Sequence, residues 1–204
     1  MSSVEQVTAD RPSADGPGQQ DGRRLRSQDS RKRIVLALLA LVQAGDVSPS
    51  AEQVAARAGV GLRTVFRHFK DMDSLYSEMA QAIEVEVREV VNLPFEAEDW
   101  RGKVLELIPR RSMVFERITP FRRASDAHRP RSAFLEAGAA RMVAIMRQIL
   151  RGLLPEEVAR DEQVFEALDL LLSFESWSRL RRDQGLAPGP ARAVLDAAVR
   201  RIID

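Results

Sequence analysis

The chain has no cysteine and only two histidines, His68 and His128, among its 204 residues. Without cysteine it can form neither a disulfide nor a thiolate metal site, and this composition suits a reducing cytosol. Two histidines also argue against a multi-histidine metal site. We therefore expect no metal ion and no cofactor.

Long apolar runs and enzyme motifs are missing as well. The longest apolar run, Ile34 to Val42, has nine residues, whereas a membrane-spanning helix needs about 20. The N-terminus carries acids, Pro and Gly in place of a basic start and an apolar stretch, so no secretory signal is visible. The sequence contains no G-x-G-x-x-G, P-loop or H-E-x-x-H motif. We expect a cytoplasmic protein that is not an enzyme, with no catalytic residues and no membrane partner.

Helical periodicity runs along most of the chain, without an alternating strand pattern or an Asn-Gly hairpin. Residues 1–26 are rich in Ser, Pro, Gly, Gln and charge and lack an apolar pattern, so they are predicted to be a disordered tail. The rest predicts an all-α fold. Helices are expected over about Ser30–Ala44, Ser50–Ala58, Leu62–Phe69, Met72–Asn92, Glu98–Thr119 with a kink or break at Pro109, Ser132–Leu154, Asp161–Asp183 and Ala191–Ile203, with Phe121–Pro130 as a loop.

The stretch Ser50 to Leu75 is the one around which the chain is organised. It predicts two short helices joined by a tight turn, Ala58-Gly59-Val60-Gly61. One side of the second helix carries the apolar residues Leu62, Val65 and Phe69. The other side carries the basic and hydrogen-bonding residues Arg63, Thr64, Arg67 and Lys70. This division is the helix-turn-helix design for the DNA major groove, although a small helical hairpin with a solvated basic face has the same pattern.

The positive charge is concentrated around this stretch. Residues 1–22 hold one basic and four acidic side chains, so their sum is −3. Residues 23–80 hold ten basic and six acidic side chains, which gives +4, and residues 81–204 hold twenty of each. Phosphate contact requires such an excess. The basic residues from Arg23 to Arg33 either form an arm that reaches DNA or are a solvated run before a helix.

The string A-G-V-G-L-R-T-V-F-R-H-F-K-D-M-D-S-L resembles the DNA-binding signature of the tetracycline-repressor (TetR-type) family, and the resemblance extends upstream to Ile34. Members of that family are all-helical homodimers that bind palindromic operator DNA. Most of them repress transcription and are released by a small-molecule ligand. The resemblance implies an N-terminal three-helix DNA-binding domain over 27–75, linked by a long helix to a helical ligand-binding and dimerisation bundle over 76–204.

The resemblance also assigns DNA-binding roles to individual residues. Arg63 and Phe66 match positions that face bases or the adjacent backbone, and Thr64 and His68 match phosphate-binding positions. Ser50 stands at a helix N-terminus that faces a phosphate, and Arg67 and Lys70 are basic neighbours on the same side. Two residues depart from the family pattern. Gly61 stands where a Ser cap is common, and Met72 stands where a Lys is usual, so one expected phosphate contact is missing.

The last two predicted helices suggest a homodimer. Both carry wide apolar bands, and two such antiparallel helices can pair with a copy of themselves as a four-helix bundle. The string L-S-F-E-S-W-S-R-L-R-R-D-Q-G-L-A also resembles the penultimate helix of many TetR-type proteins, which forms their dimer interface. The alternative is that these residues pack only the protomer core. The expected interface residues are Leu171, Phe174, Trp177, Leu180, Val194, Leu195, Val199 and Ile202.

An effector cavity is expected in the second domain. Met and aromatic residues at helical spacing form either a pocket or ordinary core. The candidates are Met113, Phe115, Phe121, Phe134, Met142, Met146 and Phe165, with Arg110, Glu116 or Arg117 supplying polarity. We therefore predict a ligand-responsive repressor that binds operator DNA as a homodimer. The alternative function is a helical ligand-binding or protein-interaction bundle without operator binding, and the effector is unknown.

Overall fold

The computed structural model describes residues 17–204, without the side chains of residues 17–23, Glu86 and Arg131. All regular structure in this range is helical, which confirms the predicted all-α class. The elements are α1 (Pro17–Gln43), α2 (Ala51–Ala58), α3 (Leu62–His68), α4 (Met72–Val91), α5 (Trp100–His128), the short 3₁₀ turn η1 (Arg129–Arg131), α6 (Ala133–Leu153), α7 (Glu156–Arg160), α8 (Glu162–Leu171), α9 (Phe174–Ser178), the π-helical turn η2 (Arg179–Asp183) and α10 (Pro188–Ile203).

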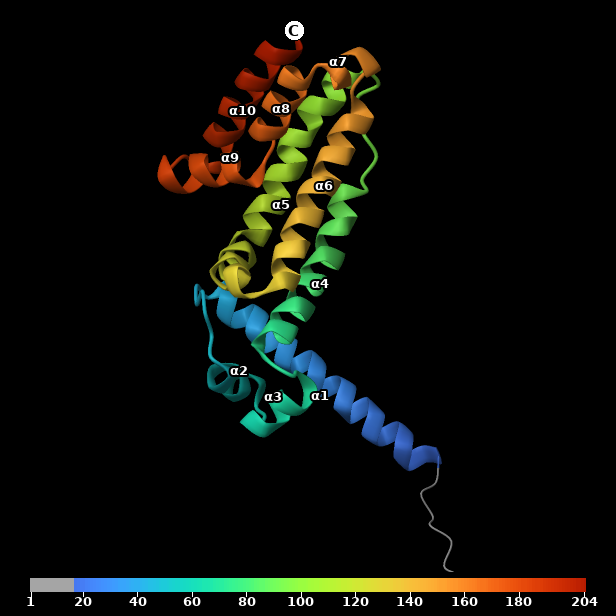
Figure 1. Ribbon diagram of the computed structural model, residues 1–204, viewed down its shortest axis with the longest axis vertical. Helices are drawn as coiled ribbons and strands as arrows, with labels where there is room; N and C mark the ends of the chain where they lie inside the picture. The colour runs from blue at the N-terminus through green and yellow to red at the C-terminus, as the bar shows by residue number, and fades with distance from the viewer. Residues whose placement is uncertain (1–16) are drawn as a thin grey trace, which may run out of the picture.

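The helices form two groups along the long axis of the molecule (Figure 1). α1, α2 and α3 lie at the lower end, and α4 runs from them into the upper group. There α4, α5 and α6 pack on one another, α10 packs on α5, and α8 contacts both α6 and α10. This is the predicted order of helix-turn-helix, linking helix and bundle. Because α4 belongs to both groups, it connects them mechanically.

The lower group has one small core to which each helix contributes. Leu38 of α1, Val54 of α2, Val65 of α3 and Leu75 of α4 are each at most 1% exposed. Burying a Leu or Val side chain contributes about 1.5–3 kcal/mol. α2 and α3 have eight and seven residues, lengths at which an isolated helix is unstable in water. Their stability therefore depends on packing against α1 and α4.

The turn between α2 and α3 follows the predicted local rules. The Ser50 hydroxyl accepts a hydrogen bond from the Gln53 N–H, and the Gln53 side chain accepts one from the Ser50 N–H, so the capping box is formed. α2 ends at Gly59, which adopts a left-handed conformation with φ 64°. Gly61 precedes α3 in an extended conformation and provides no side-chain cap. Only the first of these two glycines needs the freedom of a residue without Cβ.

Two arginines of α1 hold this turn and α3 in place. Arg31 donates to both carboxylate oxygens of Glu78 on α4 and, at 2.8 Å, to the carbonyl of His68. Its guanidinium also lies 4.5 Å from the ring centroid of Phe69. Arg33 donates to the carbonyls of Ala58 and Gly59 at the end of α2. Arg31 and Arg33 therefore brace the fold, a role that differs from both alternatives considered for the basic run, the arm that reaches DNA and the solvated run.

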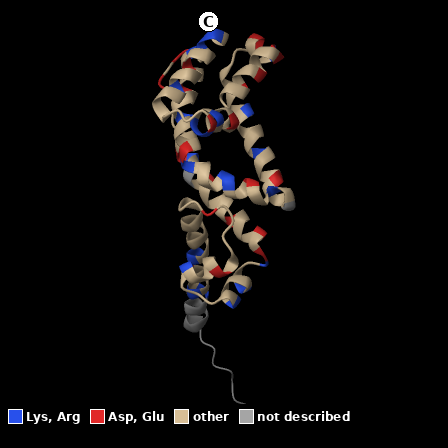
Figure 2. Cartoon of the chain, turned by 90° about the vertical axis from the view of Figure 1, so that its left-hand side faces the viewer, with Lys and Arg blue, Asp and Glu red and all other residues tan. Residues whose placement is uncertain are grey.

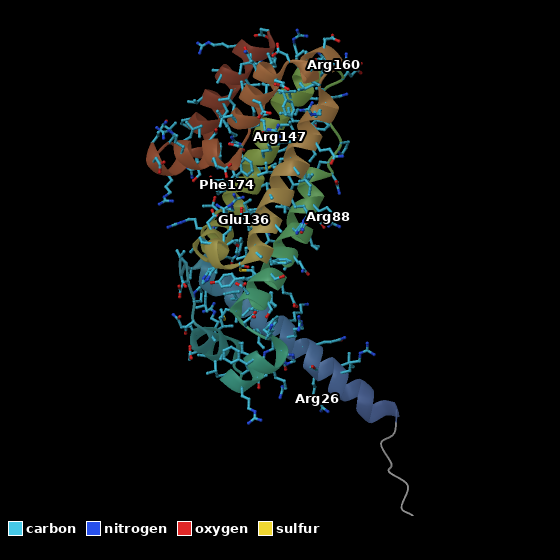
Figure 3. All side chains as sticks on the ribbon, in the orientation of Figure 1. Arg26, Arg88, Glu136, Arg147, Arg160 and Phe174 are labelled. Carbon is cyan, nitrogen blue, oxygen red and sulfur yellow. The ribbon has the colours of Figure 1, made fainter. Side chains whose placement is uncertain are left out.

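The first helix begins earlier than the sequence predicted. α1 starts at Pro17 instead of near Ser30, so residues 17–26 of the predicted disordered tail are helical. Residues 1–16 of that tail lie outside the described residues. Arg, Gln and Leu have good helix propensity, so the helix that packs as far as Arg31 continues towards the N-terminus. This segment extends beyond the other helices (Figure 1) and includes Arg26 (Figure 3).

Two prolines fail to end α5, which corrects the prediction for this region. α5 is one helix from Trp100 to His128 that contains both Pro109 and Pro120, and the expected loop over Phe121–Pro130 is helical as far as His128. A proline inside a helix costs about 3 kcal/mol because it lacks an N–H and its ring crowds the preceding turn. Several buried side chains outweigh that cost through packing. They are Val104, Leu107, Ile108, Val114, Phe115, Phe121 and Ala124.

The expected single helix over Asp161–Asp183 is interrupted. α8 ends at Leu171, and Ser173 caps a new helix, α9, by accepting a hydrogen bond from the Ser176 N–H at 3.1 Å. The Ser173 hydroxyl also donates to the Leu170 carbonyl at 2.7 Å. A serine that bonds to the backbone in this way favours a helix start over a helix interior. The break therefore comes from polar capping that apolar periodicity does not reveal.

We predict that Gly59→Ala destabilises the protein by about 1–2 kcal/mol, because an L-residue is strained in the left-handed region. The new Cβ would also lie 3.0 Å from Nη2 of Arg33. Gly61→Ser is the matched control, since Gly61 has φ −72° and an added Cβ would meet nothing within 4 Å. Urea unfolding should show the loss only for Gly59→Ala, and equal stability of the two variants would contradict this account.

Candidate functional site

The outer side of α3 is where the predicted DNA-binding residues lie. Ser50, Arg63, Phe66, Arg67 and Lys70 are exposed, whereas Thr64 and His68 are half-buried. Val65 and Phe69 are buried as predicted, but Leu62, which was expected on the same docking side, is 37% exposed at the first turn. Phe66 is 48% exposed beside these basic residues. The helix thus presents a basic surface with one aromatic side chain.

The three cationic side chains of this surface have no partner among the described residues. Within residues 24–204, Arg63, Arg67 and Lys70 take part in no ion pair and no side-chain hydrogen bond. Figure 2 marks the positions of Lys and Arg in blue on the helices at this end of the chain. Arg31 and Arg33, by contrast, are engaged as described above. The charges left free on α3 are therefore available to a negatively charged partner.

His68 is placed differently from the other candidates. Its Nε2 atom is buried without a hydrogen-bond partner among the described residues. Burial lowers the pKa of His68, and the positive charges of Arg67 and Arg31 lower it further. The imidazole is therefore neutral at pH 7 and would contribute a hydrogen bond, not a charge, to a phosphate. Its predicted phosphate role remains a prediction.

A cavity of about 720 Å³ lies between α4, α5 and α6, with α8 and α9 closing one side. This volume is within the range typical of pockets for small organic ligands. The residues predicted here that do line the cavity are Phe115, Phe121, Phe134, Met142 and Met146. Met113 and Arg117 do not line it, and neither do Arg110, Glu116 and Phe165. Five of the seven principal predicted residues thus surround one space.

The misplaced residues of α5 have a geometric explanation. At about 100° per residue, Met113 and Arg117 share one face of the helix. The cavity faces the stripe formed by Arg111, Phe115, Ile118 and Arg122. Met113 is 51% exposed on the outside. A helical-wheel comparison of α5 could have separated these faces, had the helix been recognised as continuous through its prolines.

The α4 wall of the cavity was missed in the sequence. Met79, Ile83 and Val87 line it at helical spacing, and each is at most 9% exposed in the single chain. Their helical spacing indicates one buried face of α4 but does not reveal that a cavity lies against it. The same helix carries Leu75 and Tyr76 into the core of the lower group. The wall of the cavity and the support of the helix-turn-helix are thus parts of one helix.

Arg111 is the buried cation of the cavity wall. It is 5% exposed and donates to the carbonyls of Leu172 at 2.9 Å and Met146 at 2.8 Å. Burial lowers the pKa of Arg111 to about 10, and the nearby Asp169 opposes this shift. The side chain therefore stays charged at pH 7. Its hydrogen bonds connect α5 to α6 and to the end of α8.

The end of α5 also connects the two groups of helices. His128, the last residue of α5, lies with its ring 4.3 Å from the ring of Tyr76 on α4. Its Nε2 atom is 3.2 Å from the hydroxyl of Ser48, in the loop before α2. Burial raises the pKa of Tyr76 to about 12, and its hydroxyl has no hydrogen-bond partner among the described residues. The end of α5 therefore rests on both α4 and the loop that precedes the helix-turn-helix.

The predicted dimer-interface residues divide into two sets. Trp177, Leu180, Leu195 and Val199 are at most 8% exposed, so they pack the protomer's own core, and this placement revises their assignment. Leu171, Phe174 and Ile202 are half-buried. Val194 is 46% exposed, and Leu170, which was not predicted, is 64% exposed. The sequence stripes could not separate the inner from the outer side, because both sides of α8 and α10 are apolar.

A polar contact also fixes Trp177 inside the protomer. Its Nε1 donates to Glu116 of α5 at 2.8 Å, and Arg181 makes two hydrogen bonds to the same carboxylate. Glu116, considered above as a polar residue of the cavity, instead joins α5 to α9 and η2. The hydrogen bonds from Arg181 and then Trp177 lower the pKa of Glu116.

The described residues also limit other kinds of site. In the part of the chain that the structure covers, no group of three or more His, Asp or Glu side chains is placed to hold a metal ion. Across residues 17–204, no helix combines the length and apolar character that a membrane crossing requires. The functional candidates are therefore the α3 surface and the cavity.

Comparison with known proteins supports this architecture. Neither a family model nor a curated protein matches the sequence. A putative TetR-family transcriptional regulator from Mesorhizobium loti superimposes with a TM-score of 0.63 at 22% identity, over 87% of this chain and 96% of its own. A transcriptional regulator from Rhodococcus sp. RHA1 gives 0.63 at 18% identity, over 85% and 95%.

A third solved structure, the multidrug binding protein EbrR complexed with imidazole, gives a TM-score of 0.57 at 22% identity, over 82% of this chain and 93% of its own. These structures share the arrangement of helices over nearly their whole length. The molecule is thus an all-helical protein with an N-terminal helix-turn-helix. It has the fold of the TetR-family transcriptional regulators.

We predict that Glu116→Gln weakens the folded state at neutral pH, and that this difference disappears in acid. A carboxyl whose folded pKa is lowered contributes stability above its unfolded pKa, and that stability is lost as the pH falls through the folded pKa. The difference between wild type and variant should therefore be constant well above about 4.5, the ordinary carboxyl value, and should shrink below it. Urea unfolding over a pH series measures it, and a difference independent of pH would contradict the assigned contact.

Proposed function

We propose that the protein is a TetR-family, DNA-binding transcriptional regulator that acts as a homodimer. The observation that carries this proposal is the outer face of α3. Arg63, Arg67 and Lys70 are exposed there without partners, on a short helix braced from behind by Arg31. A basic helix that is held rigidly and has no partner of its own is suited to the major groove.

The individual contacts follow from the positions on α3. Arg63 lies in the first turn, where a guanidinium can reach a guanine edge in the groove, and Phe66 lies one turn further on. Thr64, Arg67, Lys70 and His68 would contact phosphates, and Ser50 places the N-terminus of α2 towards one. Met72 is half-buried and packs against the core. Its side chain is therefore not placed to supply the phosphate contact that a Lys would make at this position.

A homodimer would place two such helices on one palindromic site. Successive major grooves on one face of DNA are about 34–36 Å apart, so the two α3 helices need that separation or a larger one. The surface that supports pairing is the outer side of α10, where Val194 is exposed with Ala193 and Ala197. α10 lies at the outside of the upper group (Figure 1), where a second copy can reach it.

Release from DNA would couple the cavity to α3. Met79 and Ile83 of α4 line the cavity, and Tyr76, one turn earlier on the same helix, supports the lower group. At the other wall, Asp126 of α5 is close in sequence to His128, which rests on Tyr76 and Ser48. A ligand that moves α4 relative to the end of α5 would change the spacing of the two α3 helices in a dimer. On this basis we propose that the regulator is a repressor, which leaves its operator when a ligand binds.

DNA binding is tested first by Arg63→Ala. If Arg63 makes a bidentate base contact, its loss should weaken binding to the selected operator by about 1–3 kcal/mol and relax the preference at one base pair. Arg160→Ala is the matched control, because it removes the same charge at the opposite end of the molecule (Figure 3). Fluorescence anisotropy with operators found by DNA selection from the purified protein measures both variants.

Three results would contradict the proposal. One is an unchanged operator discrimination in Arg63→Ala, which would reject its base-reading role. Another is an equal loss of affinity in Arg160→Ala, which would indicate unspecific attraction to the whole molecule. The third is the absence of salt-dependent binding to any DNA by the wild type. That last result would favour the alternative, a helical bundle without operator binding.

The dimer is tested by Val194→Glu. A carboxylate on the exposed side of α10 would have to be buried against the second copy, which is unfavourable without a partner charge. We expect this variant to sediment as a folded monomer in analytical ultracentrifugation and to bind operator DNA more weakly. Val85→Glu, at a 64% exposed position of α4, is the control and should leave the dimer intact. A stable dimer of Val194→Glu would reject this interface.

A further inference from the structure

The charged residues that line the cavity differ in whether they form ion pairs. The lining includes five carboxylates, those of Glu84, Asp126, Glu166, Asp169 and Glu175. It also includes five guanidiniums, those of Arg88, Arg111, Arg122, Arg129 and Arg141. Counted in this way, the wall is neutral. The contacts of each side chain show which of these charges are already engaged in ion pairs.

Four of the five carboxylates are already occupied. Arg122 pairs with Asp126 and with Glu175, each at 3.2 Å. Arg147, which does not line the cavity, bonds to Glu166 at 2.7 Å and to Asp169 at 2.8 Å. Arg147 thereby engages two acids of the wall from outside it, and its single charge is shared between them. Only Glu84, half-buried on α4, has no ion pair within residues 24–204.

Three of the five guanidiniums form no ion pair with the described residues, although one of them, Arg111, has the carboxylate of Asp169 nearby. In the described part of the chain, Arg88, Arg111 and Arg141 form no ion pair. Arg111 is buried, and both of its hydrogen bonds go to carbonyl oxygens, so three of its five N–H groups stay available. Arg88 and Arg141 are exposed on α4 and α6, and Figure 3 shows Arg88 on the outer edge of α4. One free cation is thus deep in the wall and two are near its exposed side.

The rest of the wall is apolar. Met, Phe, Ile, Leu and Val side chains of α4, α5 and α6 form most of it, with Gly138 and Ala139 leaving room on α6. A ligand that fills about 720 Å³ among such residues must be largely apolar. A buried guanidinium binds a carboxylate strongly and in a defined orientation, because its N–H groups match both oxygens. A cationic ligand would meet three unpaired arginines and a single free acid.

We propose that this cavity binds an amphipathic anion, with an apolar body between α4, α5 and α6 and a carboxylate or similar acidic group bound by Arg111. Arg88 and Arg141 attract the anion to the opening. The proposal rests on the proposed function only in taking the cavity as the effector site. It names the effector class that the regulator would sense.

The test compares three amphiphiles of equal chain length below their micelle concentrations. Dodecanoate, dodecan-1-ol and dodecylammonium are titrated against the full-length protein loaded with N-phenyl-1-naphthylamine, a neutral fluorescent probe of apolar cavities. We expect dodecanoate to displace the probe at a concentration at least about tenfold lower than the other two, the ratio that one charge-assisted hydrogen bond supplies. Equal displacement by all three, stronger displacement by dodecylammonium, or failure of the probe to bind would overturn the proposal.

Two variants locate the recognition. Arg111→Met should reduce the preference for dodecanoate over dodecan-1-ol to near one while the neutral probe still binds. The double variant Arg88→Gln with Arg141→Gln changes two exposed side chains that hold no other group, so it tests the proposal even if Arg111→Met does not fold. It should lower the preference severalfold, and more so at low salt. A preference that persists unchanged in every variant that folds would reject the assigned arginines.

Operator binding is measured in parallel, so that the two proposals fail separately. A protein that binds selected DNA but shows no preference for dodecanoate is a regulator with a different effector class. A protein that prefers dodecanoate through Arg111 but binds no DNA supports this inference and refutes the regulator. Release of operator DNA by dodecanoate, absent in Arg111→Met, would join the two.

Discussion

α2 and α3 are too short to be stable by themselves, and the contact that fixes them is the packing of α1 and α4 around Leu38, Val65 and Leu75. Arg31 strengthens this contact at its edge by joining α1 to Glu78 of α4 and to the end of α3. The position of the exposed α3 surface therefore depends on α1, which packs on both short helices, and on α4, which packs on α1. A movement of α4 reaches that surface through α1 and through the shared core around Leu75.

This dependence gives the cavity its importance. α4 contributes Leu75 to the lower core and Ile83 and Val87 to the cavity wall, so one rigid element belongs to both sites. A ligand can shift the equilibrium between two arrangements only by the difference of its affinities for them. Because α4 forms one wall of the cavity, a change in the angle of α4 changes the space available to a ligand. The cavity therefore provides such a difference in affinity. The contact of Tyr76 with His128 gives the end of α5 a part in the same movement.

Local signals in the sequence were sufficient for much of the fold. The Ser50 and Gln53 capping box and the left-handed Gly59 depend on residues within a few positions of each other, and the structure contains both. Features decided by distant contacts were not accessible in this way. The continuity of α5 through Pro109 depends on packing against other helices, and the buried state of Trp177 depends on Glu116, which is far away in the sequence. The side of α5 that meets the cavity could be recognised only once that helix was known to be continuous.

The arginines show most clearly which features the sequence alone does not reveal. Arginine is frequent throughout the chain, so neither composition nor periodicity distinguishes a brace from a binding residue. The three-dimensional contacts make this distinction. Arg31, Arg33, Arg147 and Arg181 each bind a carboxylate or the carbonyl end of a helix and thereby connect separate helices.

Arg63 and Arg67 on α3, and Arg88 and Arg111 around the cavity, are left without an acidic partner among the described residues. An unpaired guanidinium that is exposed to water costs little free energy. Arg111 is buried in the cavity wall and has lost its hydration, which its two hydrogen bonds to carbonyl oxygens replace only in part. An incoming anion would restore the remainder. The two surfaces that keep unpaired arginines are joined by α4, so a negative charge that binds at one of them can alter how the other is presented.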